Sequence, residues 1–456
     1  MLVPLLSLSL PQSPPPNIVF IVSDDAGYGD FGFTGSLQIK TPNIDSIANE
    51  GVEFTQGYVS GPVCSPSRAG FLTGRYQSRF GHEDNLAIGE VQPGDQREDI
   101  GLPVEERTIA DYMKAQGYTT GLVGKWHLGE EDKFLPKSRG FDEYWFLPGG
   151  SRPYFDQKVG KAMAIQSNYD PEPKVTYTTD DFGAQAAGFI TRNAKKPFFL
   201  YLSYTAPHTP LTPKPEDEEE FAYITDNRRR KYCGLMKGLD RSVGVVLDAL
   251  KTNKLDQNTL VIFINDNGGQ IQAGAVNAPY RGMKGTFLEG GTRIAYAMKW
   301  PGKIKAGMKF DGRVSTLDIL PTALGAASQG KSYEVAKPFD GVDLMPYLAQ
   351  SKSGDPHETL YWRMGFTGAV RDGDWKLIRM PDRPPMLYNI KQDPQEMNNR
   401  FAENPNLVAN LFKKLFAWEK DMIYPRWNTA PVWYQDNAQR YDRDGLLTQP
   451  PGKPGL

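Results

Sequence analysis

Four short apolar runs, each leading directly into charged or proton-binding residues, place the strongest limits on how this chain can fold. Runs that are apolar at nearly every position are typical of strands buried on both faces, which occur in parallel sheets covered by helices. The predicted strands are Ile18–Val22, Thr119–Val123, Phe198–Tyr204 and Leu260–Ile264, and the predicted helices between them are Glu105–Gln116, Phe182–Asn193 and Asn227–Lys251. We therefore expect an α/β fold with a mostly parallel central sheet flanked by helices.

The chain is long enough for more than one folding unit, because its 456 residues exceed the size at which a single core stops growing. After about residue 350 the pattern changes to short strand-like pieces, followed by the helical segment "NPNLVANLFKKLFAWEKDM". Closely spaced short strands predict an antiparallel sheet. We expect a main domain over residues 17–350 and a smaller C-terminal α+β subdomain with an antiparallel sheet over residues 351–456.

The first 16 residues are expected to lie outside this fold. The segment "MLVPLLSLSL" is apolar but short and has no basic residue, so it resembles a leader or the remnant of a secretory signal. The following "PQSPPP" predicts an extended linker. These features favour a periplasmic or secreted protein. No other stretch predicts a membrane span, and a formal net charge of −2 excludes a bulk polycation that would hold nucleic acid.

Each predicted strand is followed by side chains that can bind ions or move protons. In chain order these are Asp24 with Asp25, Lys125 with His127, His208, and Asp266 with Asn267. Ligands of open α/β sheets bind beyond the carboxyl ends of the strands, so we expect these side chains to converge on one crevice. Each alone has an ordinary explanation, either as turn chemistry or as a hydrogen-bonded structural histidine. Their joint occurrence at four strand ends favours a functional site.

Four of these residues form a set of hard oxygen ligands: Asp24, Asp25, Asp266 and Asn267. Three carboxylates and an amide oxygen suit calcium, with magnesium as the alternative, whereas zinc prefers nitrogen and sulfur. The sequence therefore predicts a site for a hard divalent cation. The acidic run "EDEEE" at residues 216–220 is instead interpreted as a solvated loop or a helix start.

A short helix is predicted within "GPVCSPSRAGFLTGRY", residues 61–76. Ser65 is a good N-cap, Pro66 suits the first helical position, and Gly74 can end the helix. The helix N-terminus and Arg68 together create surroundings that would ionise the thiol of Cys64.

Cysteine is a poor match for the predicted cation, because a soft thiolate binds hard cations weakly. An unmodified Cys64 therefore fits this site badly. The only other cysteine, Cys233, is most simply a small core residue on a helix, although a disulfide between the two stays open at this point.

The segment "CSPSR" resembles the Cys-x-Pro-x-Arg signature of the formylglycine-dependent sulfatases, members of the alkaline phosphatase superfamily. Further motifs match that family in order: "DDAGYGDFG", "AGFLTGRY", "GKWHLG", "APHTP", "NDNGG", "RGMKGTFLEGGTR" and "LYNIKQDPQEMNN". Bacterial polysaccharide sulfatases are similar in the stretch "SRFGHEDN". One departure is Asn265, where many relatives carry serine. The resemblance implies that residues 17–350 form a sulfatase catalytic domain, and that the chain hydrolyses sulfate esters.

The resemblance also implies cofactors. Cys64 would be oxidised after translation to formylglycine by a formylglycine-generating or an anaerobic maturase enzyme, and the modified residue would complete a calcium shell. The other ligands implied are Asp24, Asp25, Asp266 and Asn267.

Roles in the reaction follow from the same resemblance. Arg68 and Lys125 would hold the aldehyde hydrate, and His127 would later accept a proton from it. His208 and Lys284 would bind the sulfate oxygens, and one of them would protonate the departing alcohol. We expect His208 to be the donor, because its unperturbed pKa lies nearest neutrality. Without the resemblance, Lys284 would be interpreted as a solvated loop lysine.

Aromatic and basic residues outside the motifs favour a sulfated carbohydrate or polysaccharide as the substrate, because aromatic faces suit sugar rings and arginines suit sulfates. The predicted substrate contacts are Arg79, His82, Glu83 and Arg152, and the other aromatic and basic residues considered are Trp145, Tyr154, Trp362, Arg426, Trp427, Trp433 and Tyr434. The alternative is that several of them pack a subdomain interface.

Two rival functions stay open on the sequence. A phosphodiesterase or phosphonate monoester hydrolase of the same superfamily could use the same formylglycine and metal. A non-catalytic, calcium-dependent sugar-binding protein would need no modified cysteine, but it also would not need the basic residues and histidines that accompany the acidic ones. Relative turnover of aryl sulfate and aryl phosphodiester distinguishes the first rival from a sulfatase.

Overall fold

The computed structural model describes residues 14–86, 95–96, 100–427 and 431–442, without the side chains of 431–434 and 437. Most of the predicted leader therefore lies outside the described residues, as do the side chains of Trp433 and Tyr434. Within the described residues, no helix is both long enough and apolar enough to cross a bilayer.

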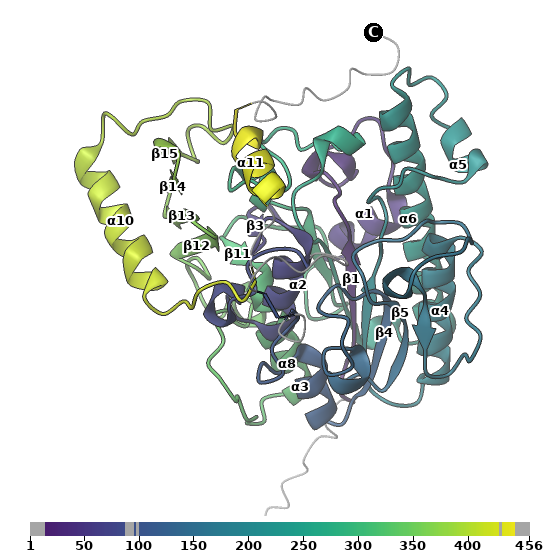
Figure 1. Cartoon of the computed structure of the whole chain (residues 1–456). Coiled ribbons are helices and arrows are strands. Elements are labelled where there is room, and N and C mark those ends of the chain that lie inside the picture. Colours follow the sequence, from purple (N-terminus) through teal and green to yellow (C-terminus); the bar gives the residue numbers. More distant parts are fainter. Residues whose placement is uncertain (1–13, 87–94, 97–99, 428–430, 443–456) are drawn as a thin grey trace, which may run out of the picture.

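A nine-stranded sheet forms the centre of the molecule (Figure 1). Its strands, in spatial order, are β10 (Met308–Phe310), β2 (Val52–Phe54), β9 (Tyr296–Lys299), β8 (Thr259–Asn265), β1 (Asn17–Ser23), β7 (Phe198–Ser203), β4 (Thr119–Lys125), β5 (Glu143–Leu147) and β6 (Gln166–Ser167). Strands β9 and β6 run antiparallel to their neighbours, and the other pairings are parallel. The predicted, mostly parallel sheet is thus confirmed, with all four predicted strands at its centre.

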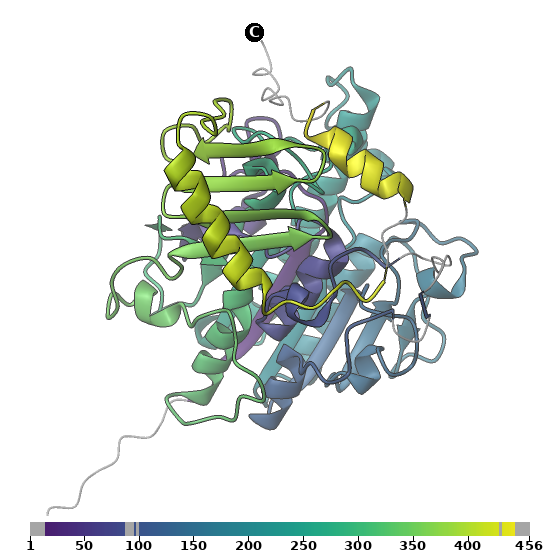
Figure 2. The same ribbon diagram turned by 60° about the vertical axis from the view of Figure 1, so that its left-hand side comes forward.

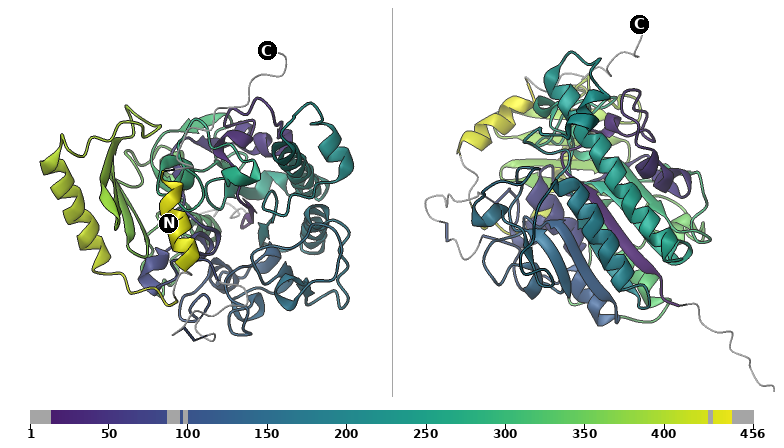
Figure 3. Two further views of the ribbon diagram at one scale, coloured as in Figure 1. Left: turned by 45° about the horizontal axis from the view of Figure 1, so that its top comes forward. Right: turned by 90° about the vertical axis from the view of Figure 1, so that its right-hand side faces the viewer.

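Helices cover both faces of this sheet (Figure 3). One face carries α1 (Pro42–Asn49), α4 (Thr178–Arg192) and α6 (Asn227–Thr252), and the other carries α2 (Cys64–Thr73), α3 (Ile109–Ala115) and α8 (Ile319–Ser328). The side chains of β1 alternate between the hydrophobic cores on the two faces of the sheet, because successive side chains of a strand point to opposite faces. Val19 and Ile21 join the cluster that holds α1, α4 and α6, whereas Phe20 and Val22 join the one with α2, α3 and α8. Cys233 is fully buried on α6, as predicted.

Helix starts were harder to predict than the strands. Helix α3 begins at Ile109, because the Thr108 side chain accepts the backbone N–H of Asp111 and caps it there. Helix α2 begins at Cys64 with Val63 as N-cap, so the prediction of Ser65 as cap is wrong. The Ser65 hydroxyl instead donates to the carbonyl of His127 at 2.7 Å. Gly74 does end the helix, in the left-handed region with φ of 66°.

Four antiparallel strands form a second sheet in the C-terminal part: β12 (Thr359–Met364), β13 (Thr367–Asp372), β14 (Trp375–Met380) and β15 (Arg383–Asn389). Helix α10 (Pro405–Glu419) lies across the outer face of this sheet (Figure 2). Val370, Leu377 and Leu387 pack under it against Leu411 and Leu415. The remaining helices and strands with bounds are β3 (Gly57–Tyr58), α5 (Pro215–Glu219), α7 (Glu289–Thr292), β11 (Val314–Ser315), α9 (Met345–Leu348) and α11 (Pro431–Arg440).

The inner face of the C-terminal sheet packs on loops of the main sheet. Trp362 and Ile378 share a cluster with Val63, which precedes Cys64, and with Phe287, which follows Lys284. A fully buried ion cluster lies in the same interface, where Lys376 Nζ of β14 is 2.9 Å from Glu289 and 3.0 Å from Glu396. The second sheet therefore reaches the edge of the predicted site.

Candidate active site

Ten predicted residues meet at the carboxyl ends of the central strands. Strand β4 ends in Lys125, and the loops after β1, β4, β7 and β8 contribute acidic, amide and histidine side chains. The first turns of α2 contribute Cys64 and Arg68, and a later loop contributes Lys284. All are buried except His208, whose side chain is 18% exposed. The ten are Asp24, Asp25, Cys64, Arg68, Lys125, His127, His208, Asp266, Asn267 and Lys284.

Each of the three carboxylates is paired with a cation. Lys125 Nζ lies 2.7 Å from Asp24, Lys284 Nζ lies 2.8 Å from Asp25, and Arg68 Nη2 lies 2.8 Å from Asp266.

These pairings set the charge of the carboxylates. Burial raises the pKa of Asp24 and Asp25, but the neighbouring cations, Lys125 and Lys284 foremost, outweigh it and hold both values below normal. At Asp266, burial and the charge of Asp24 raise the pKa to about 6 despite Arg68. Asp24 and Asp25 therefore keep their negative charge at neutral pH.

The thiol of Cys64 lies at the centre of these groups. Its Sγ is 3.6 Å from an oxygen of Asp24 and 3.8 Å from one of Asp25, and Lys284 Nζ donates to it at 3.1 Å. Burial raises the pKa of Cys64 well above its usual value, although Lys125 and Lys284 oppose this. The expected ionisation of an unmodified thiol is therefore wrong, because burial outweighs the helix N-terminus and nearby cations. Cys64 and Cys233 are both free thiols, so no disulfide joins them.

The donor set fits a hard cation. The side-chain oxygen of Asn267 is buried and has no hydrogen-bond partner among the described residues, which leaves a free ligand atom. Its Nδ2 donates to Asp25 at 2.8 Å and aims the amide at that carboxylate. Ligand atoms of Asp24, Asp25, Cys64 and His208 lie within 4.8 Å of one another. A buried oxygen without a partner is costly unless something binds it.

Asp266 stands apart from that metal-capable group. Arg68 holds its Oδ2 through two donors, and its Oδ1 accepts the backbone N–H of Asp25 at 3.2 Å. Arg68 is in turn fixed by Tyr201 and Ser203 of β7. Tyr201 and Ser203 were missed by the sequence reasoning, although their spacing of two places them on one face of the strand.

The two histidines have different environments. Nδ1 of His208 lies 2.7 Å from the carbonyl of Thr209, which assigns its proton to Nδ1 and turns Nε2 toward Asp25, 3.5 Å away. Burial lowers the pKa of His208, although Asp24 and Asp25 raise it. His127 has a left-handed backbone with φ of 59°, and burial followed by the charge of Lys125 lowers its pKa well below normal. Burial therefore favours the neutral form of both rings near pH 7.

Asn265 is a positioning residue that sequence reasoning noted only as a departure. Its Oδ1 accepts from the Ser23 hydroxyl at 2.8 Å and from the backbone N–H of Ala26 at 3.0 Å, and its Nδ2 donates to the Ala26 carbonyl at 2.8 Å. It thus fixes both ends of the turn that presents Asp24 and Asp25. Its place directly before Asp266 was the available signal.

The four predicted substrate contacts lie outside the group of ten. Arg79 forms a double ion pair with Asp340, at 2.7 and 2.8 Å. Glu83 accepts from Arg363 at 2.7 Å. Arg152 is buried, and its Nε donates to the Pro153 carbonyl at 3.2 Å.

His82 is the predicted contact nearest to the group. Its Nε2 lies 2.6 Å from the Ser65 hydroxyl, next to Cys64, and its ring packs edge-on against Trp427 with centroids 4.6 Å apart.

Several of the aromatic residues considered as substrate contacts instead pack in the interior of the protein. Trp145 and Trp362 are buried in the cores, and Trp362 donates to the carbonyl of Val59 at 2.7 Å. Tyr154 is also buried, and its hydroxyl donates to the His208 carbonyl at 2.8 Å, so it supports the backbone at that histidine.

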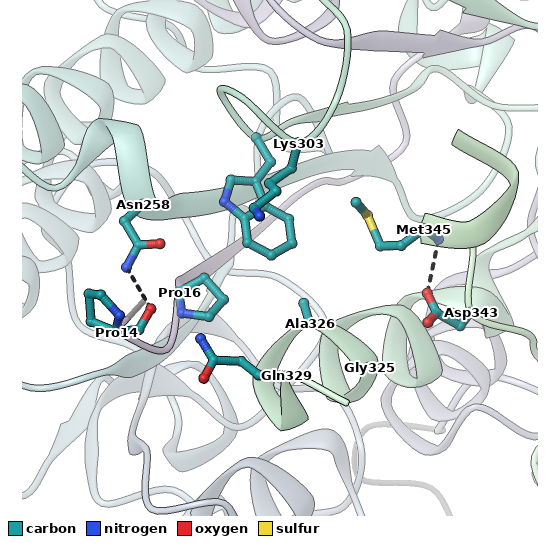
Figure 4. A pocket seen from close by; sticks show the side chains of 10 residues that line it. Pro14, Pro16, Asn258, Lys303, Gly325, Ala326, Gln329, Asp343 and Met345 are labelled. Carbon is teal, nitrogen blue, oxygen red and sulfur yellow. Dashed lines mark hydrogen bonds between the residues drawn. The ribbon is translucent and has the colours of Figure 1, made fainter. Parts of the chain in front are cut away.

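A cavity of about 400 Å³ at the other end of the sheet contains none of the ten residues (Figure 4). Pro16 directly precedes β1 and Asn258 directly precedes β8, and both line it together with Lys303. It therefore lies at the amino ends of these strands, away from the ends where ligands of such sheets bind.

A protein-family model and a curated relative that match this chain are both named as sulfatases. The family model described as Sulfatase matches residues 16–329. N-acetylgalactosamine-6-sulfatase of Rattus norvegicus is 33% identical over 390 residues, covering 82% of this chain and 72% of the relative.

Solved structures match over most of the chain. The crystal structure of Ps i-CgsB is 33% identical with a TM-score of 0.85, over 95% of this chain and all of that one. The same protein has been solved in complex with k-i-k-neocarrahexaose, with 32% identity, a TM-score of 0.84 and the same coverage. Phosphonate monoester hydrolase of Agrobacterium radiobacter, at 20% identity and a TM-score of 0.65 over 90% of this chain and 96% of that one, shares the fold.

Proposed function

We propose that this chain, which belongs to the sulfatase family, hydrolyses sulfate esters carried on a carbohydrate. The chain is a sulfuric ester hydrolase with an alkaline phosphatase-like fold. The carbohydrate substrate is supported by two relatives, one named for N-acetylgalactosamine 6-sulfate and one solved with a neocarrahexaose. The observation that carries the proposal is the position of Cys64 Sγ within 3.8 Å of Asp24, Asp25 and Lys284.

Cys64 is proposed to act as formylglycine, formed by a maturase enzyme. The modification replaces the thiol with an aldehyde, whose hydrate supplies a hydroxyl nucleophile and an oxygen that suits a hard cation. The protonated thiol of the unmodified residue offers neither, because burial keeps its pKa high. The proximity of Lys284 Nζ at 3.1 Å supports a nucleophilic oxygen at this position, since a cation favours the deprotonated form.

Calcium is the proposed metal, held by Asp24, Asp25, Asp266, Asn267 and the modified Cys64. A bound calcium ion supplies positive charge that draws the sulfate oxygens into position and favours the ionised nucleophile. The Oδ1 of Asn267, which has no hydrogen-bond partner in the part of the chain that the structure describes, supports this assignment. Asp266 would contribute an oxygen while its other oxygen stays with Arg68.

The basic side chains around the proposed metal site offset negative charge, and a histidine there accepts a proton. Lys284 Nζ binds a sulfate oxygen, and Arg68 and Lys125 hold the modified residue and offset the acidic ligands. His127, whose ring is neutral, accepts a proton from the modified residue.

His208 is proposed to donate a proton from Nε2 to the leaving alcohol. Burial lowers the pKa of His208, and the negative charge of a sulfate ester bound beside Nε2 would raise it.

Conversion of Cys64 and release of sulfate test the proposal together. Protein expressed with a maturase should release sulfate from members of a panel of sulfated oligosaccharides, and mass spectrometry should find the Cys64 peptide converted to the aldehyde. Cys64→Ala should abolish the release, whereas Cys233→Ala, a matched change of a buried cysteine outside the site, should retain it. Full activity of protein with an ordinary thiol at Cys64 would contradict the mechanism.

The rival phosphodiesterase activity is tested on the same preparation. An aryl sulfate should be turned over faster than an aryl phosphodiester, and the reverse order would favour the rival. A non-catalytic sugar-binding protein would bind the oligosaccharides without releasing sulfate.

A periplasmic or secreted location is proposed from the apolar start of the chain. Cell fractionation and N-terminal sequencing of the mature protein test it.

A further inference from the structure

A second cavity, of about 780 Å³, lies between the loop that follows α2 and the C-terminal sheet. We call it the aromatic pocket. Its wall includes Phe366 at the β12–β13 turn and the segment 422–425 with Trp427, which comes after α10. A cavity of this size is typical of sites that bind a small organic group.

Exposed apolar side chains gather at this pocket. Tyr424 is 89% exposed, Phe366 is 71% exposed and Ile423 is 47% exposed, and all three line it. Clustered large apolar side chains exposed to water commonly mark a binding site. Flat aromatic rings offer apolar faces to the C–H faces of a sugar, and Tyr424 also offers a hydroxyl for hydrogen bonding.

The charges of the pocket are already paired. Arg363 is held by Glu83, with Nε at 2.7 Å from its carboxylate, and Arg379 is held by Glu419 at 2.8 Å. A sulfated sugar would have to displace a carboxylate from one of these arginines, whereas the hydroxyls of a neutral sugar can donate to the carboxylates without breaking either ion pair.

A short chain of contacts connects the pocket to the sulfate centre. Trp427, in the pocket wall, packs against His82, whose Nε2 lies 2.6 Å from the hydroxyl of Ser65. Ser65 uses its own proton to bond the carbonyl of His127, so Nε2 of His82 donates to it. Burial lowers the pKa of His82 to about 3, and the ring is therefore neutral. The wall of the pocket thus lies two side chains from Cys64.

We propose that the aromatic pocket binds an unsulfated sugar unit of the same glycan chain whose sulfate ester occupies the Cys64 centre. This inference rests on the proposed function and deepens it, because it assigns a neutral neighbour to the sulfated sugar. The enzyme then selects glycans in which sulfation is interrupted.

Chain-length dependence tests the proposal. Matured protein is assayed on an aryl sulfate and on monosaccharides, disaccharides, tetrasaccharides and hexasaccharides of carrageenan and of keratan sulfate, whose unsulfated sugar units carry no charge. Tyr424→Ala and Phe366→Ala remove exposed rings and leave the core intact. Tyr223→Ala is the matched control, because Tyr223 is 53% exposed and does not line the pocket.

For the glycan that wild type desulfates, kcat/KM should rise with chain length, and the pocket variants should lose about tenfold or more on the longest substrate only. Their activity on the aryl sulfate or the monosaccharide should equal that of wild type. An unchanged length dependence in both variants would overturn the pocket assignment and leave the sulfatase function standing. Release of sulfate from no substrate by wild type would overturn the proposed function, and the pocket assignment with it.

A charge variant tests the preference for a neutral sugar. Glu419→Gln leaves Arg379 without its carboxylate partner, so the variant should gain several-fold in kcat/KM on the more highly sulfated of two oligosaccharides of equal length. Lys414→Gln alters another charged side chain of α10, which pairs with Asp372 outside the pocket, and should leave that ratio unchanged. An unchanged ratio for Glu419→Gln would overturn the neutral preference.

Discussion

Nη1 of Arg440 donates to the backbone carbonyl of Lys284 at 2.7 Å. Arg440 ends α11 and is itself held by Asp436, with Nη2 at 2.7 Å. The next residue, Tyr441, accepts the backbone N–H of Phe287 at its hydroxyl, also at 2.7 Å. The end of the described chain thus supports the loop that carries a proposed catalytic lysine.

Loss of the Arg440 contact should reduce turnover. Arg440→Ala leaves the buried carbonyl of Lys284 without this donor, and hydrogen bonds from charged groups contribute about 1.5–3 kcal/mol. We expect kcat to fall roughly tenfold to a hundredfold if that energy is needed to hold Lys284 in place. Arg440→Lys, which keeps a charged donor, should recover part of the activity. Equal kcat with a changed melting temperature would show that the contact serves stability alone.

Removal of the Asn267 amide should weaken calcium binding. Its Oδ1 has no partner among the described residues, so Asn267→Ala removes a proposed ligand. Wild-type protein should melt at a higher temperature with added calcium, since binding to the native state alone stabilises it. The variant should lose most of that shift. Asn253→Ala, at the C-cap of α6, serves as control and should retain it. An intact calcium shift in Asn267→Ala would remove Asn267 from the ligand set.

Turnover of two substrates distinguishes the residue that donates the proton from the residue that binds the sulfate oxygens. A sugar hydroxyl needs a proton as it leaves, whereas a nitrophenolate does not, and general acid catalysis contributes about a hundredfold to ten-thousandfold. His208→Ala should therefore slow a sulfated sugar far more than nitrophenyl sulfate, and Lys284→Ala should slow both similarly. The opposite pattern would exchange the two roles, which is a real alternative because Lys284 keeps its proton. Burial opposes that charged form, but Asp25 raises the pKa of Lys284 overall.

A pH-dependent contribution to stability is expected at His357. Its Nε2 lies 2.7 Å from Asp318 Oδ1. Burial lowers the pKa of His357, but the charge and hydrogen bond of Asp318 raise it overall. A raised folded-state pKa gives stability that is complete below about pH 6.5, the unfolded value, and that is lost as the pH rises through the folded value.

Urea unfolding at pH 5.5 and 8.5 measures this contribution. Wild type should lose more unfolding free energy between these pH values than His357→Gln, which cannot titrate. An identical change in both proteins would show that the His357–Asp318 pair contributes no pH dependence.

The central sheet could be predicted because its strands are continuous apolar runs, and the site followed because parallel strands end at one edge. Other features left no local signal. The Ser65 hydroxyl is used in a contact to His127, 62 residues away, so its cap-like sequence position was misleading. The pKa of Cys64 depends on burial by distant segments, which outweighs the helix N-terminus visible in the sequence. The contact of Arg440 with Lys284 spans 156 residues and carries no motif.

The buried contact of Lys376 with Glu289 and Glu396 bears on how enzymes of this kind could be recombined. A chimera whose foreign C-terminal sheet carried no cation at the position of Lys376 would leave the buried Glu289 with Arg293, 3.3 Å away, as its ion-pair partner in the main part of the chain. Loss of one partner of a buried charge is strongly destabilising. Such a chimera should fold poorly even if its new binding surface were intact. Exchange of the segment 281–289 together with residues 359–442 would keep both halves of the interface and offers a practical boundary for domain grafting.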